Sequence, residues 1–405
     1  MKMRGYAIII AAFFTVSIAY GIRYGYGMLL PGMIKSLEIG KTEAGIIYAS
    51  YFVAYTLFSP LLGLLSDRYD SRLILTVFPA LMATGALLMS YAVTLGQAAV
   101  FFSLAGIGHA ACWAPVVSLV QLWVKDGHRG TALAFATMGS GVGIASWGMI
   151  LPVVVERSSW QAGWYAMGIF GLFVAVLNFI LVRNPPGEDD SQQCCEKSRK
   201  NWKNKPSYMQ ILKKKQLWLI GFSYLLIGFI VLIPFTFLGV YGVEELHLPY
   251  RDATRLFSLL AVSGMAGKII LGILSDKWGR VQVMMLCGAL LGTGCLGIVN
   301  LSAFQLKICS VAMVGLGFGA VWPVYAAAAM DFFPRAVAGT VIGLWTVFLG
   351  IGSILSPVIC GWTIDRSGSY FGPFMIGFIA SVFSVLLLIP GLKQSGVTAW
   401  KAEEY

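Results

Sequence analysis

Charged residues are scarce in this chain. Asp, Glu, Lys and Arg make up 12% of its 405 residues, whereas 58% are hydrophobic. Soluble domains carry about 25% charged residues, and a water-facing globule cannot bury this much apolar surface. The composition therefore excludes an ordinary soluble fold and indicates that the lipid bilayer is the solvent. Segments that cross a bilayer need about 20 apolar residues and must satisfy their backbone groups internally, so they are helices.

Groups that support catalysis or hold metals are also few. The chain has three His and seven Cys residues, without metal-ligand spacing, and we find no catalytic triad or carboxylate pair. Five Cys lie in apolar segments and form no disulfide framework. Cys194 and Cys195 lie in a polar loop, where acylation and an incidental pair both remain open. We expect no enzymatic activity, no cofactor and no metal.

Twelve apolar segments are long enough to span a membrane. We predict helices at 6–33, 43–65, 73–93, 98–124, 130–155 and 160–182, and at 215–243, 253–275, 281–300, 305–330, 338–360 and 370–392. Pro115 and Pro323 predict bends in the fourth and tenth helices. A polar linker at 184–214, with a surface helix near 206–214, separates two bundles at 1–183 and 215–405.

A repeat with a constant spacing of 209 residues relates the two bundles. Gly63-Leu-Leu-Ser-Asp67-Arg68 recurs as Gly272-Ile-Leu-Ser-Asp276-Lys277, and the same offset pairs Trp113 with Trp322. Helix position and direction are preserved in this register. Two parallel six-helix repeats in an apolar chain are typical of a duplicated membrane transporter.

Basic residues indicate the orientation in the membrane. With a cytoplasmic N-terminus, 20 of the 29 Lys and Arg residues fall on the cytoplasmic side and seven on the other. The positive-inside rule then predicts that both termini are cytoplasmic. The net charge of +11 is thereby explained by topology and by contact of the linker with anionic lipids, without binding to nucleic acid.

Acidic side chains are missing from the depths at which two basic ones occur. Arg23 lies near the middle of the first predicted helix, and Lys268 lies slightly cytoplasmic of the centre of the eighth. A charge at this depth costs about 2.5–3.5 kcal/mol on insertion scales. An anionic substrate would supply the missing charge, because Arg binds carboxylates bidentately and Lys offers a point charge. Snorkelling and pairing with backbone carbonyl groups are the alternatives.

Aromatic side chains extend the candidate site. On helical spacing, Tyr20 and Tyr24 share a face with Arg23, His109 shares a face with Trp113, and Trp322 shares one with Tyr325. These rings would hold the apolar part of a small acid, or they only pack the bundle. His109 is able to carry a proton or to hydrogen-bond a neighbouring helix permanently. A proton shared with the anion, or anion exchange without protons, needs no such group.

The repeated loop motif resembles the cytoplasmic loop signature of the major facilitator superfamily. Three further stretches resemble its monocarboxylate porters: Tyr20–Gly27, Gly267–Gly272 and Gly361–Tyr370. The resemblance covers essentially the whole chain. It implies an all-α membrane protein with the major facilitator fold, twelve transmembrane helices in two parallel six-helix repeats, and transport by alternating access.

The resemblance also implies roles for individual residues. Arg23 and Lys268 match the porters' cations in helices 1 and 8. The loop residues Asp67, Arg68, Asp276, Lys277 and Arg280 would form gating contacts between the halves, or only anchor the topology. Proton-coupled porters place an Asp four residues before the helix 8 cation, whereas this chain has Gly264. Proton symport therefore does not follow from the resemblance.

The expected protein is a monomeric secondary transporter of the bacterial inner membrane. Its partners would be a small organic anion, first of all a monocarboxylate, together with membrane lipids and, if it is a symporter, protons. A dicarboxylate or organophosphate transporter or an anion exchanger also suits two cations. An exporter of amphipathic compounds would leave both cations without a role, and a membrane sensor would need a larger soluble domain than the linker allows.

Overall fold

A computed structural model describes residues 3–66, 69–124, 129–183 and 208–393. The first half contains α1 (Met3–Leu37), α2 (Lys41–Ser66), α3 (Ser71–Met89), α4 (Leu95–Ala110), α5 (Ala114–Trp123), α6 (Arg129–Arg157) and α7 (Trp160–Leu181). The second contains α9 (Tyr208–Lys213), α10 (Lys215–Glu244), α11 (Tyr250–Trp278), α12 (Arg280–Asn300), α13 (Phe304–Phe332), α14 (Arg335–Ser367) and α15 (Phe371–Leu388), followed by a 3-10 turn at Ile389–Lys393. The described residues form no strand. They provide twelve spans long and apolar enough to cross a membrane, which confirms the predicted number.

The fourth predicted helix is not continuous. α4 ends at Ala110, and α5 begins at Ala114 with Pro115 in its first turn, where a missing N–H costs no intrahelical hydrogen bond. The expected bend is thus a break. α13, by contrast, continues through Pro323. The short helix α9 lies where the surface helix was expected near 206–214.

Helix packing repeats between the halves. α1 packs on α6, α2 on α4 and α3 on α7, and the equivalent pairs in the second half are α10 with α14, α11 with α13 and α12 with α15. The repeat extends to single atoms. A Cβ at Gly106 would lie 2.4 Å from the Tyr51 carbonyl oxygen, and a Cβ at Gly315 would lie 2.4 Å from the Leu260 carbonyl oxygen. All four residues obey the 209-residue offset, so glycine permits the same close helix crossing twice.

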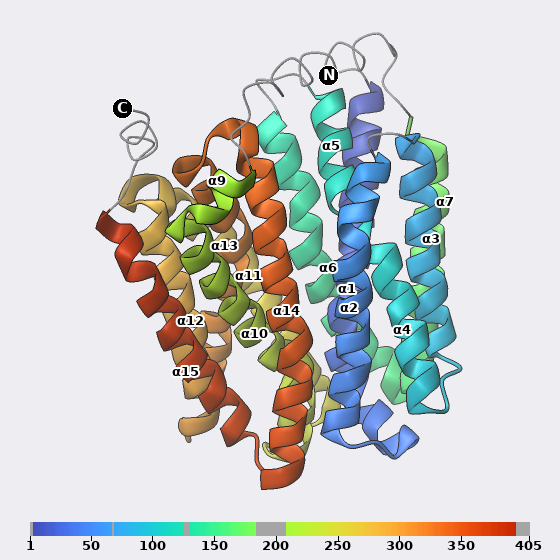
Figure 1. Cartoon of the computed structure of the whole chain (residues 1–405). Helices are drawn as coiled ribbons and strands as arrows, with labels where there is room; N and C mark the ends of the chain where they lie inside the picture. Colours follow the sequence, from blue (N-terminus) through green and yellow to red (C-terminus); the bar gives the residue numbers. More distant parts are fainter. Residues whose placement is uncertain (1–2, 67–68, 125–128, 184–207, 394–405) are drawn as a thin grey trace.

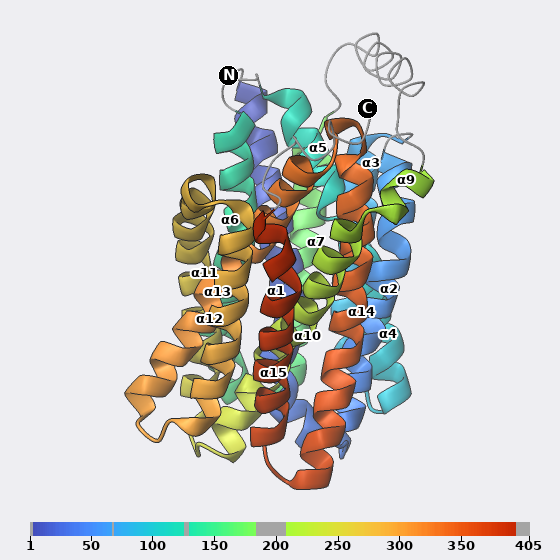
Figure 2. The same ribbon diagram turned by 60° about the vertical axis from the view of Figure 1, so that its left-hand side comes forward.

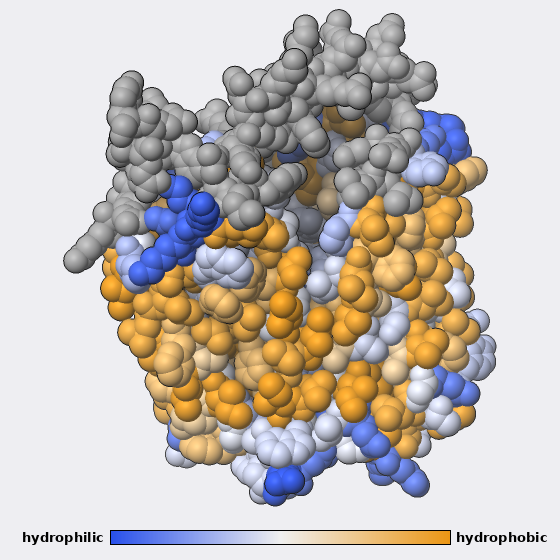
Figure 3. Space-filling view, in the orientation of Figure 1, coloured by the Kyte–Doolittle hydropathy of each residue, from blue (hydrophilic) through white to orange (hydrophobic). Residues whose placement is uncertain are grey.

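The two bundles meet along a seam formed by α1 with α10, α2 with α14, and α6 with α11. Figures 1 and 2 both show α2 and α14 side by side at this seam. The face in Figure 3 carries a broad apolar belt with polar residues gathered toward the two ends. That distribution suits a bundle surrounded by lipid.

The seam is closed at one end and hollow toward the other. We call the end where α1 passes into α2 the closed end, because hydrogen bonds join the bundles there between Lys41 and Glu244, between Thr42 and Asp365, and between Tyr250 and the Met28 carbonyl group. The open end is the one where α1 begins. There the surface is recessed between the bundles (Figure 3).

Candidate functional site

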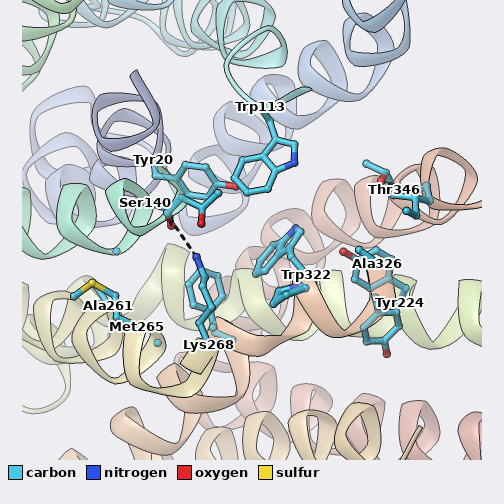
Figure 4. A pocket seen from close by; sticks show the side chains of 18 of the residues that line it. Tyr20, Trp113, Ser140, Tyr224, Ala261, Met265, Lys268, Trp322, Ala326 and Thr346 are labelled. Carbon is cyan, nitrogen blue, oxygen red and sulfur yellow. Dashed lines mark hydrogen bonds between the residues drawn. The ribbon is translucent and has the colours of Figure 1, made fainter. Parts of the chain in front are cut away.

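A cavity of about 250 Å³ lies between the two bundles. Its walls come from α1, α6, α10, α11, α13 and α14 and from the break before α5. The lining residues are Tyr20, Trp113, Thr137, Ser140, Gly141, Tyr224, Ala261, Gly264, Met265, Lys268, Phe318, Gly319, Trp322, Pro323, Tyr325, Ala326, Ile342, Trp345 and Thr346. Figure 4 shows that side chains from both bundles surround this space.

Lys268 brings the one charged side chain among the described residues that line the cavity. Its Nζ donates a hydrogen bond of 3.3 Å to the Thr137 carbonyl oxygen in the other bundle, which is the dashed line in Figure 4. An ammonium group has three donors, so further ones are available to a ligand. The lining described here contains no carboxylate to neutralise the charge.

Arg23 does not line the cavity in this conformation. The residue is 4% exposed, and its guanidinium carbon lies over the rings of Phe52 at 4.5 Å, Tyr24 at 5.2 Å, Tyr55 at 5.4 Å and Tyr20 at 5.8 Å. Its Nε is buried without a hydrogen-bond partner in the described part of the chain. Aromatic faces attract a cation by about 0.5–2 kcal/mol each, yet they leave its charge uncompensated. We call these four rings the Arg23 cage.

Tyr20 belongs to both the cavity and the cage, so its ring is the partition between them. His109 lies on the cage side, fully buried, with Nδ1 2.5 Å from the Tyr51 hydroxyl oxygen and its ring in edge contact with Tyr20 at 5.4 Å. It is therefore hydrogen-bonded to a neighbouring helix and does not line the cavity. Tyr20 thus lines the cavity, whereas Arg23 and Tyr24, one helical turn further along α1, do not.

Tyr24 closes the cage toward the second bundle. Its ring lies 3.9 Å from that of Phe235 in α10, and its hydroxyl group is buried without a partner among the described residues. Trp113, Trp322 and Tyr325 do line the cavity, as does Tyr20. The structure thus brings five of the eight predicted binding residues to one cavity and leaves Arg23, Tyr24 and His109 behind it.

Several lining residues were missed from the sequence. Met265 and Phe318 lie one helical turn from Lys268 and Trp322, so extending those two faces would have found them. Tyr224 and Trp345 carry no comparable signal. Their position depends on how α10 and α14 cross α13, where Tyr224 stacks on Tyr325 with ring centroids 4.3 Å apart.

Glycine at position 264 is explained by the close packing of α11 on α13. A Cβ there would lie 3.2 Å from the Gly315 carbonyl oxygen, and one at Gly319 would lie 1.8 Å from the Gly264 carbonyl oxygen. α11 and α13 therefore touch through their backbones. A Cβ at 264 would require its neighbours on α13 to yield by a few tenths of an ångström, so this close crossing favours glycine over the porters' Asp.

The predicted gating residues that the structure describes, Asp276, Lys277 and Arg280, lie at the open end. Asp67 and Arg68 fall outside the described residues. At the end of α11, Asp276 and its neighbour Lys277 precede Arg280, whose guanidinium binds Asp276 at 2.6 Å and Asp331 at 3.3 Å. These ion pairs are internal to the second bundle. Contacts across the seam by these residues remain a prediction for another conformation.

Hydrogen bonds and an ion pair join the two bundles at the closed end, and the sequence did not predict them. Asp365 accepts hydrogen bonds from the backbone N–H groups of Lys41 at 2.9 Å and Thr42 at 2.8 Å, and from the Thr42 hydroxyl at 2.6 Å. Glu244 binds Lys41 Nζ at 2.8 Å and accepts from the Tyr370 hydroxyl at 2.7 Å. Burial and the neighbouring Glu244 raise the pKa of Tyr370, which keeps this donor protonated.

Asp365→Asn is expected to loosen the closed end. The change removes the charge at the first turn of α2 and turns an NH₂ group toward N–H donors, at a cost of about 0.5–2 kcal/mol. Hydrogen–deuterium exchange of peptides covering 38–46 and 361–371 should accelerate several-fold. Asp252→Asn is the matched control, because Asp252 pairs only within α11, with Arg255. Equal exchange in wild type and Asp365→Asn would contradict this role.

No group of three or more His, Cys, Asp or Glu in the described residues is arranged to hold a metal ion.

Comparisons with known proteins agree with this architecture. A sequence model of the Major Facilitator Superfamily matches residues 12–357. The chain is similar to the hexuronate transporter of Bacillus subtilis (strain 168), with 24% identity over 94% of this chain and 93% of that protein. It is also similar to monocarboxylate transporter 12 of Xenopus laevis, with 23% identity over 82% and 76%. The glycerol-3-phosphate transporter of B. subtilis is 23% identical over 95% and 90%.

Two solved structures share the fold. An inward-facing, unoccupied bacterial homologue of the human lysosomal transporter Spinster superposes with a TM-score of 0.77 at 13% identity, covering 98% of this chain and 99% of that one. A mutant of the nucleoside transporter NupG also gives 0.77 at 13% identity, covering 95% and 99%.

Proposed function

The chain belongs to the Major Facilitator Superfamily, and from this premise we propose that it moves a small organic anion, first of all a monocarboxylate, across the membrane by alternating access. One observation carries the proposal. Lys268 faces the cavity and Arg23 lies behind Tyr20, while no Asp or Glu in the described helices lies at their depth. An anion would balance this charge, and buried charges are stable when they are paired.

In the proposed cycle, Lys268 receives the anion in the conformation described here. Tyr20 then turns aside, and the Arg23 guanidinium binds the carboxylate with two hydrogen bonds. Residues 1–183 and 215–405 rock about the site. With both termini cytoplasmic, as the basic residues predict, the open end faces the cytoplasm. The loops of Asp67 and Asp276 would then brace the outward-open state of a monomer in the bacterial inner membrane.

Coupling is the second part of the proposal. With Gly264 in place of the porters' carboxylate, a proton would travel shared with the anion or through His109. Exchange of one anion for another needs neither a shared proton nor His109. His109 is buried against Tyr20 and Tyr55, two rings of the Arg23 cage, so a second positive charge there would be costly, which favours the two routes that leave it unprotonated.

A dianion is the other candidate substrate class. Two cations near one site suit a dicarboxylate or an organophosphate, and relatives named for galactarate/D-glucarate and glycerol-3-phosphate transport support this alternative. Exchange of such anions would follow from the same site. Export of amphipathic compounds is less well supported, because it leaves Lys268 and Arg23 without a role.

Ligand-induced thermal stabilisation tests the proposal. Purified protein would be heated with acetate, benzoate, glucuronate, glucarate or glycerol 3-phosphate at pH 5.5 and 7.5, and with a neutral analogue of each. A ligand at about 100 times its Kd should stabilise the fold by about 2.7 kcal/mol. We expect stabilisation by at least one anion, retained in Lys268→Arg and lost in Lys268→Met. Equal shifts with the neutral analogues, or none with any anion, would refute an anion site.

A further inference from the structure

Resting on the proposed function, we infer that the substrate is a monocarboxylate with a planar aromatic body, and that Trp113 and Trp322 clamp this body while Lys268 binds the carboxylate. The cavity differs from a site for polyhydroxy acids or dianions in three respects: its charge, its hydrogen-bonding groups and its walls.

The charge of the cavity matches one carboxylate. Lys268 is the one Lys or Arg among its described lining residues, and the ring of Tyr20 separates Arg23 from this space. Passage of the carboxylate from Lys268 to Arg23 engages the cations one after the other. A second carboxylate would therefore lie among aromatic side chains without a partner, which is costly for a buried charge.

About half of the side-chain hydrogen-bonding groups that line the cavity are already in use. Thr137, Ser140 and Thr346 donate their hydroxyl hydrogens to backbone carbonyl oxygens of their own helices. Trp345 Nε1 donates to the Leu217 carbonyl oxygen, and the Tyr325 hydroxyl pairs with a Ser side chain outside the cavity. The described lining has no Asp, Glu, Asn, Gln or His. The hydroxyl groups of a sugar acid would find hydroxyl oxygens here but no carboxylate or amide side chain to bind them, and unsatisfied buried groups weaken binding.

The walls are aromatic and come from both bundles. Trp113 and Trp322, which the repeat relates, line the cavity from opposite bundles, and Lys268 lines it with them (Figure 4). Phe318 meets Trp322 edge to face at 5.0 Å and holds its orientation. Neither indole N–H has a hydrogen bond among the described residues. Parallel or edge contacts with a flat ring suit such walls better than contacts with a hydroxylated chain.

Four probes separate the contributions of the single charge, the hydroxyl groups and the aromatic ring. Isothermal titration of the purified wild-type protein would compare benzoate with glucuronate, phthalate and benzyl alcohol. Benzoate is expected to bind at least about tenfold more tightly than each of the other three, because it alone combines one charge with a bare ring.

Substitutions at Trp322 test the clamp. Trp322→Leu should weaken benzoate binding about tenfold, whereas Trp322→Phe should weaken it less than about threefold, because a ring is retained. Trp362→Leu is the matched control, since Trp362 is half-exposed outside the cavity. It should leave benzoate affinity unchanged.

The outcomes distinguish this inference from the proposed function. Tighter binding of glucuronate or phthalate than of benzoate would overturn the aromatic monocarboxylate and leave an organic anion site in place. Benzyl alcohol binding as tightly as benzoate, or no binding by any anion, would overturn both. If Trp322→Leu does not fold, the ranking of the four probes on the wild-type protein still decides.

Discussion

Arg23→Met is expected to abolish uptake while the protein stays folded. Methionine approximates the length of the side chain but removes the charge and every donor, so the transported anion loses its second partner. Loss of one member of a buried charged pair costs about 3–5 kcal/mol, which corresponds to a transport rate at least about 100-fold lower. Initial rates of substrate uptake into proteoliposomes would measure the effect.

Stability separates this role from a structural one. Arg23 is buried in an aromatic cage with Nε unpaired, so replacing it with methionine should leave the melting temperature unchanged or raise it. Arg23→Lys keeps the charge without the bidentate fork and should retain part of the activity. Wild-type uptake by well-folded Arg23→Met or Arg23→Ala protein would refute a substrate role for Arg23.

Gly27→Ala is expected to stop the closed end from forming. A Cβ at Gly27 would lie 2.0 Å from the Phe235 carbonyl oxygen, in the backbone of α10. Neither helix can yield there by a rotamer change, so α1 and α10 must separate. Overpacking costs about 1–3 kcal/mol, which shifts a two-state equilibrium about 5- to 150-fold away from this conformation.

Cross-linking measures that shift. In a background with Cys194, Cys195 and Cys309 changed to Ser, cysteines at Lys41 and Glu244 should be joined by a bifunctional thiol reagent that spans the length of the native ion pair, whose charged ends meet at 2.8 Å. Adding Gly27→Ala should lower the yield severalfold, and uptake should fall with it.

Gly343→Ala is the matched control for Gly27→Ala. It adds the same methyl group to α14 at a place with no atom within 4 Å, and it should change neither the cross-linking yield nor uptake. Unchanged cross-linking in Gly27→Ala would show that this crossing does not control access. Alanine favours helices over glycine, so a lower yield would not reflect a weaker α1.

The fold could be predicted further than the site. The offset that pairs Gly106 with Gly315 also pairs the carbonyl groups they touch, so the repeat carries the packing as well as the helix order. The break at 111–113 was less predictable. Pro115 and Pro323 lie in equivalent helices, one residue out of the repeat register, but only the first has an interrupted helix. Local sequence rules treat both prolines alike, and tertiary packing decides between them.

Prediction of the site from the sequence is limited in a different way. Helical spacing places Tyr20, Arg23 and Tyr24 on one face of α1, but it does not indicate what covers that face. In the structure Tyr24 packs on Phe235 across the seam while Tyr20 meets the cavity. Which side chain lines a cavity depends on how two bundles dock in one conformation, and a local pattern contains no such information.

The uncompensated Arg23 has an electrical consequence. Moving one elementary charge through 100 mV corresponds to about 2.3 kcal/mol. In the proposed cycle Arg23 need not travel far for the membrane voltage to act on it, because the cavity would open first to one side of the membrane and then to the other. When no proton accompanies the anion, the empty carrier of the proposed cycle bears one positive charge more than the carrier loaded with a monocarboxylate. Voltage would therefore drive the return of the empty carrier and the transit of the loaded one to different extents, and the Arg23 cage would make turnover sensitive to membrane potential.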